Sequence, residues 1–545
     1  MTRMKKLLSI VLAITLILSI GILSSFAEGA TSETFTITMS TNSGHTYTAY
    51  QIFTGDLSEN TLSNVDWGNG VNGAGLLNAL KNDETYGSAF AACTTAADVV
   101  NVLSGYANNG TEITALAKIF AAHKANGSGT ASTTGENGIQ ISGLAAGYYL
   151  IVDSTAAASM PDGGSYSDFM LNLVGDISIQ AKDATVTATK KVQDRNDSTA
   201  EPTLTGLQDS ADYDIGDDIP FPLTMTLPEN YEKYSSYTLS FHDDMSKGLT
   251  YKTDSAMIRY GDADAIKFTD QTAGTSTFTD GHLWVWTIAD LKTVAPALQA
   301  GDTITLTYQA TLNSNAVIGS VGNPNKMHVE YSNDPNGTTT GRTPDDLNQV
   351  FTYQAVFEKV TTVDGVKKHL SGADFTLYKV KDGITDAAVK AFDPSKDETK
   401  DLIVKSGYVA VKTAGQYDGD ETAVPDSVFT FNGIDDGTYV LVETTTPAGY
   451  NTAAPLKFVV IAQHESSSNT PLLTALSGNR SSGVVDVTKT SAIEDGNNAI
   501  SAEIENNRGA TLPSTGGIGN TAFYIFGGIL VLAAVLLLIR KKHLG

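Results

Sequence analysis

Three residues on the apolar faces of expected strands could react with one another if folding brings them together. Alternate residues of a β-strand point to the same side of the sheet. Lys190 shares such a face with Val186 and Ala188. By the same alternation, Asp243 and Asn325 fall among aromatic and aliphatic side chains. The middle of the chain therefore turns a lysine, an acid and an asparagine inward.

A second set of the same three types follows in the same chain order. Lys359 aligns with Phe357, Glu443 with Leu441, and Asn506 with the apolar residues of the last expected strand. The strand of Glu443 is apolar on its opposite face too. Burying a lone lysine or carboxylate costs several kcal/mol. A buried ion pair beside a hydrogen-bonded asparagine would meet that cost, but the repetition of the set favours chemistry.

The chemistry that these residue types allow is formation of an isopeptide bond. Burial lowers the pKa of a lysine, so its neutral amine can act as a nucleophile. Burial raises the pKa of a carboxyl, which can then donate a proton to an amide oxygen. Fixed geometry supplies a large effective molarity, and attack on the carboxamide expels ammonia. The expected pairs, each with its self-processing catalytic acid, are Lys190–Asn325 with Asp243 and Lys359–Asn506 with Glu443.

Short strands are expected to position both sets. The runs Tyr237–Phe241, Leu283–Ile288 and Thr303–Ala310 alternate with period two. Many short strands separated by glycine and asparagine turns favour β-sandwiches. The sequence therefore predicts a mainly β fold with tandem sandwich domains at 183–345 and 346–508.

The segment 28–182 predicts a mixed α+β domain. Residues Phe35–Met39 alternate like a strand, and Thr111–Lys124 carries apolar residues on one helical face. A strand pair is expected at Ile139–Ile141 and Tyr148–Val152.

The N-terminus predicts export. A basic start is followed by the apolar run Leu7–Leu23 and by small residues at Ser25 and Ala27. This order is typical of a signal peptide, here cleaved after Ala27 with Ala30 as the alternative site. A retained membrane-anchoring helix is the competing interpretation.

The C-terminal residues 509–545 hold three consecutive signals. An LPxTG motif is formed by Leu512, Pro513, Ser514, Thr515 and Gly516. The apolar stretch 522–539 is just long enough for a transmembrane helix, and the basic tail 540–542 would stop translocation. The combination resembles the sortase cell-wall sorting signal, in which a transpeptidase cuts after the threonine and passes the acyl group to an amine. We therefore expect a membrane-held precursor and a wall-anchored product.

The composition of the expected mature chain excludes one class of partner. The 35 lysines and arginines, less three at each removed end, leave 29 against 60 acids, a net charge of −31. A nucleic-acid-binding protein needs a basic surface, so we expect no nucleic acid among the partners of this chain. Cys93 is the single cysteine, so no intramolecular disulfide can stabilise the chain.

The chain resembles the backbone (major) subunits of sortase-assembled Gram-positive pili over essentially its whole length. The stretch Leu370–Lys379 and the E-box-like stretch Tyr439–Tyr450 resemble the collagen-adhesin B-type immunoglobulin-like domain of that family. In it, the E-box glutamate, here Glu443, promotes the isopeptide bond. The preceding domain resembles the A-type variant, in which an aspartate, here Asp243, has that role. The resemblance implies immunoglobulin-like sandwiches and a covalent homopolymer.

The resemblance also implies a lysine that links one subunit to the next. The family carries it in a YPK-like motif near the start of the second domain. The stretch Ile179–Lys182 lacks the Tyr-Pro, but Lys182 lies eight residues before Lys190, a family-like spacing. Thr515 of one subunit would then join Lys182 of the next. An ordinary solvated lysine is the alternative.

Enzyme motifs are weak or missing. Gly68–Gly73 formally matches GxGxxG but lacks the flanking βαβ unit, the eight histidines lack HExxH spacing, and there is no GxSxG elbow. We expect no enzyme, no cofactor and no catalytic metal. The expected partners are sortase, neighbouring pilin subunits and peptidoglycan. The alternative function is a monomeric wall-anchored adhesin that binds a host matrix protein and needs no Lys182.

Overall fold

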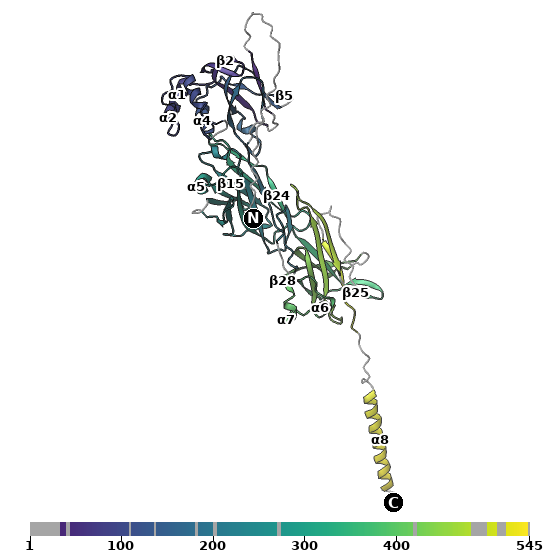
Figure 1. Cartoon of the computed structure of the whole chain (residues 1–545). Coiled ribbons are helices and arrows are strands. Elements are labelled where there is room, and N and C mark those ends of the chain that lie inside the picture. Colours follow the sequence, from purple (N-terminus) through teal and green to yellow (C-terminus); the bar gives the residue numbers. More distant parts are fainter. Residues whose placement is uncertain are drawn as a thin grey trace, which may run out of the picture. The chain divides into compact units, whose positions relative to one another are not determined.

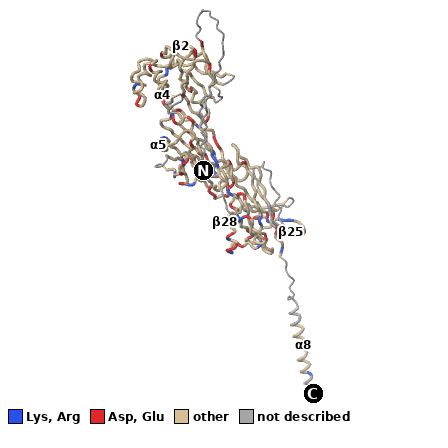
Figure 2. Tube along the Cα trace, viewed as in Figure 1, with Lys and Arg blue, Asp and Glu red and all other residues tan. Residues whose placement is uncertain are grey.

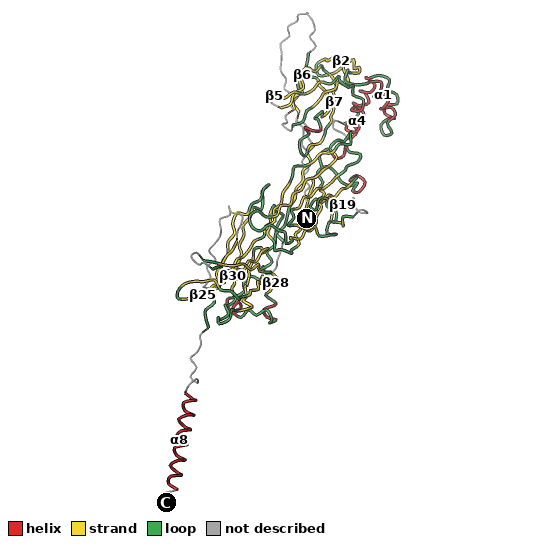
Figure 3. Tube along the Cα trace, turned by 180° about the vertical axis from the view of Figure 1, so that it is seen from behind, coloured by secondary structure: helices red, strands yellow, loops and turns green. Residues whose placement is uncertain are grey.

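The computed structural model shows a mainly β chain, as the sequence predicts (Figures 1 and 3). It describes residues 33–39, 44–107, 111–135, 138–179, 184–199, 204–269, 274–417, 422–480, 499–509 and 519–542. Two compact units are formed. The first ends at Ser159 and also takes in the segment that begins at Asp168, and the second takes in Met160–Ser167 and the chain from Asp183 onward.

The first unit combines two sheets with helices. The helices are α1 (Gly73–Asn82), α2 (Gly87–Phe90), α3 (Ala96–Leu103) and α4 (Thr111–Ala122). The strands are β1 (Phe35–Met39), β2 (Tyr47–Ser58), β3 (Thr61–Trp67), β4 (Thr130–Ala131), β5 (Thr133–Gly135), β6 (Gly138–Leu144), β7 (Gly147–Asp153), β9 (Asp168–Leu173) and β10 (Ile177–Ile179). One sheet has the order β10-β1-β6-β5 and the other β3-β2-β7-β9, with β4 beside β2.

The expected strand pair in this unit is wrong as a pair. Both stretches are strands, but β6 pairs with β1 and β5, whereas β7 pairs with β2 and β9. The two strands lie in different sheets and bury Ile141 and Ile151 in one shared core. Apolar side chains on both strands therefore meet across the core rather than along a shared edge. The expected helix is confirmed by α4, which buries Leu116 and Phe120.

The second unit begins with a sandwich whose core runs from Val186 to Val350. Its strands are β12 (Thr187–Lys190), β13 (Ser210–Asp212), β14 (Asp218–Thr226), β15 (Leu239–Met245), β16 (Leu249–Tyr251), β17 (Met257–Tyr260), β18 (Ile266–Lys267), β19 (Thr275–Thr279), β20 (Leu283–Ile288), β21 (Thr303–Leu312), β22 (Asn323–Ser332), β23 (Thr340–Arg342) and β24 (Asp346–Phe351). One sheet has the order β12-β14-β21-β17-β18, with β16 on β21. The other has the order β13-β24-β22-β15-β20-β19, with β23 on β22. A small separate ribbon joins β8 (Gly164–Ser165) to β11 (Ala184–Thr185).

A second sandwich has its core between Phe351 and Ile504. Its strands are β25 (Tyr353–Val363), β26 (Val366–His369), β27 (Asp374–Val380), β28 (Ile403–Tyr408), β29 (Ala410–Gly415), β30 (Val424–Ile434), β31 (Gly437–Thr445), β32 (Leu456–His464), β33 (Leu473–Arg480) and β34 (Ala499–Glu505). One sheet has the order β26-β25-β30-β29, and β34 runs parallel to β25. The other has the order β28-β27-β31-β32-β33.

Local sequence explains these strands. In β21, threonine and glutamine alternate with buried residues that include Ile304 and Leu306, so one face packs and the other meets solvent. The turn from β25 to β26 consists of Asp364 and Gly365, both with positive φ (53° and 79°). Asp-Gly is the pair that a two-residue hairpin turn of this hand prefers.

The remaining helices are few. In the second unit α5 (Leu291–Val294), α6 (Asp386–Lys390) and α7 (Asp397–Lys400) are single turns. Helix α8 (Gly519–Lys542) covers the stretch expected to cross the membrane. Within the described part of the chain, no helix was found whose length and hydropathy suffice for a membrane span. Acidic positions occur along both units (Figure 2), which accords with the net charge of −25 of the whole chain.

Candidate functional site: two buried lysine–acid–asparagine clusters

The first cluster begins with Lys190, the last residue of β12. Pairing with β14 places it opposite Leu223, and its alternation with Val186 directs it into the core. The side chain is fully buried, with Nζ bonded to the carboxylate of Asp243 and 5.1 Å from the centre of the Phe221 ring. A lysine with this little water around it needs the acid beside it.

Asp243 and Asn325 come from β15 and β22, which are neighbours in the facing sheet. Their antiparallel register pairs Asp243 with Met327 and Met245 with Asn325, so the two side chains are diagonal neighbours on the inward face. Both are fully buried. The fold thus brings together all three residues that the sequence predicted for this cluster, one from one sheet and two from the other.

Tyr308 of β21 joins the three residues. Its Oη donates to Oδ1 of Asp243 at 2.8 Å and accepts from Nδ2 of Asn325 at 2.8 Å. The Nζ of Lys190 lies 3.3 Å from the same oxygen. Sequence reasoning misses this tyrosine, because an aromatic residue on an apolar strand face is typical of ordinary core packing. The signal available in the sequence was its place on the same strand face as Leu306.

The electrostatics of the cluster make the amine easier to deprotonate. Burial lowers the pKa of Lys190 to about 8, against the attraction of Asp243. Burial also raises the pKa of Asp243, against the attraction of Lys190. Both shifts move the shared proton from the amine toward the carboxyl. The buried Oδ1 of Asn325 has no hydrogen-bond partner among the described residues, which is unusual for a purely structural amide.

The second cluster holds Lys359 and Asn506 in direct contact. Strands β25 and β34 are parallel neighbours that pair Lys359 with Ile504, and Asn506 directly follows β34. The backbone nitrogen of Asn506 donates to the carbonyl of Val360 at 3.0 Å. The Nζ of Lys359 donates to Oδ1 of Asn506, and both side chains are buried. The amine therefore lies against the carboxamide that it is expected to attack.

Glu443 of β31 reaches this pair from the facing sheet. Its Oε1 lies 3.3 Å from Nζ of Lys359 and accepts a hydrogen bond from Nδ2 of Asn506 at 2.8 Å. Its Oε2 accepts from the backbone nitrogen of Ala453 at 2.6 Å, which orients the carboxylate. Burial lowers the pKa of Lys359, against the attraction of Glu443. The sequence predicted contact with the amide oxygen; the acid instead bridges the attacking and leaving nitrogens.

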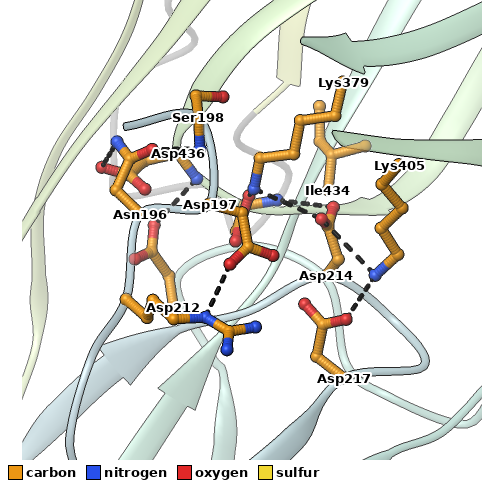
Figure 4. A network of polar contacts seen from close by, with 12 residues as sticks. Asn196, Asp197, Ser198, Asp212, Asp214, Asp217, Lys379, Lys405, Ile434 and Asp436 are labelled. Carbon is orange, nitrogen blue, oxygen red and sulfur yellow. Dashed lines mark hydrogen bonds and ion pairs between the residues drawn. The ribbon is translucent and has the colours of Figure 1, made fainter. Parts of the chain in front are cut away.

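A third buried lysine, Lys379 of β27, lies where the two sandwiches of the second unit meet (Figure 4). Its Nζ bonds to Asp435 and lies 3.3 Å from Oδ2 of Asp214. Lys405 adds a bond of 2.6 Å to Asp217 and approaches Asp214 at 3.5 Å. Sequence reasoning misses this network, because its members come from separate sandwiches.

The third lysine differs from the other two in its proton affinity. Burial favours the neutral form, but the attraction of Asp435 and Asp214 outweighs it and raises the pKa of Lys379. A lysine that stays protonated is no nucleophile. No asparagine amide contacts its Nζ among the described residues. The residue therefore forms an ion pair that joins the two sandwiches.

Several predicted site residues lie outside the described residues. These are the signal-peptide site at Ala27, the linking residue Lys182 and the sorting motif Leu512, Pro513, Ser514, Thr515 and Gly516.

Three family descriptions match successive parts of the chain. "Gram-positive pilin backbone subunit 2, Cna-B-like domain" matches residues 215–335 and includes Asp243 and Asn325. "Prealbumin-like fold domain" matches 358–470 and includes Lys359 and Glu443. "LPXTG cell wall anchor motif" matches 504–543.

Known relatives extend over most of the chain. The trypsin-resistant surface T6 protein of Streptococcus pyogenes serotype M6 is 24% identical over 425 residues, which cover 68% of this chain and 71% of the relative. The solved T6 backbone pilin of the same serotype covers 88% of this chain and 98% of its own, at 16% identity and a TM-score of 0.50. The full-length major pilin SpaD of Corynebacterium diphtheriae covers 87% and 97%, at 17% identity and a TM-score of 0.45.

Proposed function

We propose that this chain, a homologue of the backbone pilins of Gram-positive bacteria, is the structural backbone subunit of a covalently polymerised, sortase-assembled surface pilus. The observation that carries the proposal is the match of a pilin backbone domain and an LPXTG anchor to one chain. The anchor places the product at the cell wall. The two buried clusters supply the internal cross-links that such a fibre needs.

In the second cluster, the neutral amine of Lys359 attacks Cγ of Asn506. A bond forms between Nζ and Cγ, the bond from Cγ to Nδ2 breaks, and ammonia leaves. Glu443 contacts both nitrogens, so it can take the proton that the amine loses and give it to the departing nitrogen. Burial of all three side chains excludes water, which would otherwise solvate the charged amine.

In the first cluster, the same reaction would join Lys190 to Asn325. Asp243 does not contact the amide directly, so the proton would pass through the hydroxyl of Tyr308. In the structure the phenol accepts from Nδ2 of Asn325 and donates to Asp243. Once Asp243 has taken the proton that the amine of Lys190 loses, both hydrogen bonds reverse: the protonated acid donates to Oη, and the phenol gives its own proton to the leaving nitrogen, which departs as ammonia. Tyr308 is therefore a proposed member of the reacting group.

The two bonds would brace each sandwich along its length. Each closes a loop of more than 100 residues between an early and a late strand, which stabilises a domain by about 5 kcal/mol on the loop-entropy model. A force applied at the strand ends would be borne by the covalent bond before the intervening strands could separate. With Cys93 as its single cysteine, the chain has no disulfide to serve this purpose.

Polymerisation would use Thr515 of one subunit and Lys182 of the next, with sortase as the transpeptidase. Force would then enter the second unit at its start and leave after its last strand, so both cross-linked sandwiches would carry the load and the first unit would not. Peptidoglycan would hold the base of the fibre. We also propose the domain limits 28–182, 183–345 and 346–508 on this basis.

An immunoblot of wall extracts boiled in detergent tests the proposal. Wild type should give a ladder of high-mass bands, and Lys182→Ala should reduce it to monomer, because the amine acceptor is gone. Lys252→Ala is the matched control, since Lys252 is a half-exposed lysine that pairs with Asp218. A monomer band in wild type, in cells that express the cognate sortase, would favour the solitary adhesin. A ladder that persists in Lys182→Ala would support the pilus but show that another residue is the linking nucleophile.

A further inference from the structure

Two histidines lie side by side on the outward face of the first sandwich. His242 of β15 and His328 of β22 are direct partners in the antiparallel register. Their rings stack with centroids 4.7 Å apart and an angle of 12° between the planes. His242 directly precedes the inward Asp243, and His328 directly follows the inward Met327. The two rings therefore lie on the opposite face of the strands that carry Asp243 and Asn325.

A carboxylate completes this group. Glu330 lies two residues beyond His328 on the same face of β22. Its Oε2 stands 3.3 Å from Nε2 of His242, and that nitrogen makes no hydrogen bond to any described residue. One ligand atom from each of the three residues falls within 4.8 Å of the others.

We propose that His242, His328 and Glu330 bind a divalent transition-metal ion, with Zn²⁺ as the ion whose preferences fit. Two imidazole nitrogens and one carboxylate oxygen form a common zinc donor set, completed by water. Donor atoms about 2.0–2.1 Å from a tetrahedral zinc lie about 3.3 Å apart. The His242–Glu330 separation already has this value. The side chains are partly exposed, which leaves a position for water.

The surroundings both support and oppose the ion. Asp345 lies 3.6 Å from Nδ1 of His328, where a carboxylate can orient the ring and leave Nε2 for the metal. Arg342 opposes binding, because β23 places it opposite Glu330. Its guanidinium bonds to Asp345, which offsets part of its charge. An ion held here would tie β15 to β22 independently of the covalent bond on the other face.

Calorimetric titration of the metal-free mature chain with Zn²⁺, without a histidine tag, tests the proposal. We expect one ion per chain with micromolar or tighter affinity and a melting temperature that rises with zinc concentration. His328→Ala and Glu330→Gln should each weaken binding by at least about tenfold. Arg342→Gln should strengthen it, because a competing positive charge is removed.

The matched control is His282→Ala. His282 pairs with Asp244 at 2.6 Å on the neighbouring part of the sheet and contributes nothing to the proposed donor set, so its removal should leave zinc affinity unchanged. Each variant is first checked for the wild-type mass deficit relative to its own sequence and for the wild-type melting temperature without zinc. The proposal is overturned by absence of saturable binding, by unchanged affinity in His328→Ala, by equal loss in His282→Ala, or by unchanged affinity in Arg342→Gln.

Discussion

Asn325 donates a hydrogen bond from its Nδ2 to the Oη of Tyr308, at 2.8 Å. The phenol therefore stands between the amide and Asp243, which accepts from the same Oη. In the other sandwich, Glu443 contacts the amide nitrogen of Asn506 without an intermediary. In both sandwiches a lysine, an acid and an asparagine come together, but the acid is connected to the amide through Tyr308 in the first and directly in the second. Substitutions at different residues should therefore block the two bonds.

Tyr308→Phe is expected to slow the bond between Lys190 and Asn325 by at least about tenfold, because it removes the hydroxyl that connects acid and amide. Freshly purified wild type should be lighter than its sequence mass by two ammonias, about 34 Da in all. The variant should lack only one, about 17 Da. Intact-mass spectrometry measures both.

Tyr237→Phe is the control for that change. Tyr237 is equally buried in the same sandwich, but its hydroxyl has no hydrogen-bond partner among the described residues. Its variant should keep the full mass deficit. A full deficit in fresh Tyr308→Phe would remove the phenol from the mechanism.

Glu443→Ala should abolish the bond between Lys359 and Asn506, because the proton transfer between their two nitrogens is lost. The deficit relative to the variant's own sequence mass should shrink by one ammonia, about 17 Da, and the melting temperature should fall. Glu505→Ala, at a neighbouring acid on the outward face, should retain both bonds. If the deficit of the Glu443 variant stays complete, the acid has been assigned wrongly.

Lys379→Met should destabilise the contact between the sandwiches by about 3–5 kcal/mol, because Asp435 and Asp214 lose the cation between them. Urea unfolding followed by tryptophan fluorescence measures the change. The mass deficit relative to the variant's own sequence should equal that of wild type, because a protonated Lys379 forms no bond. A wild-type deficit larger by one water, about 18 Da, would instead indicate condensation with Asp435.

Lys400→Met is the matched control, since Lys400 pairs with Asp397 on the surface. Its removal should change stability by less than about 1 kcal/mol. The double variant Lys379→Met with Asp435→Leu should recover part of the loss, because it removes the buried carboxylate that has lost its cation, whereas Asp214 keeps Lys405 at 3.5 Å.

Asp436→Asn should raise stability at pH 8 and leave it unchanged near pH 3. Burial, reinforced by repulsion from Asp212 and Asp194, raises the pKa of Asp436 from 3.8 to about 7. A group with a raised folded-state pKa contributes stability that is complete below about pH 4 and is lost as the pH rises through about 7. Calorimetry at both pH values should show a melting temperature about 2–4 °C higher for the variant at pH 8 alone.

Asp397→Asn provides the comparison for that experiment. The Asp397 side chain is 96% exposed, so the substitution should give nearly equal shifts at the two pH values. If the Asp436 variant also gave nearly equal shifts at the two pH values, the pKa of the Asp436 carboxyl would not be affected by the contact between the sandwiches.

Much of the fold could be predicted because its strands are determined by patterns within short segments of the sequence. Period-two alternation identifies β21, and the same rule places Lys190 and Asp243 inward without any knowledge of their neighbours. Alternation does not reveal which strands pair. The two strands at Ile139–Ile141 and Tyr148–Val152 are therefore predicted correctly as strands but lie in different sheets.

By itself, the sequence determined the class of the protein, its C-terminal anchor motif and the identity of six inward residues, since composition, motif order and side-chain alternation are properties of short segments. Only the tertiary structure decided which of these residues touch. It inserted Tyr308 between Asp243 and Asn325, turned Glu443 toward the leaving nitrogen, and gave Lys379 two acids that keep it charged. The physical reason is that distance, burial and local charge set proton affinity and reactivity, and residues far apart in the chain acquire them only when the sheets pack.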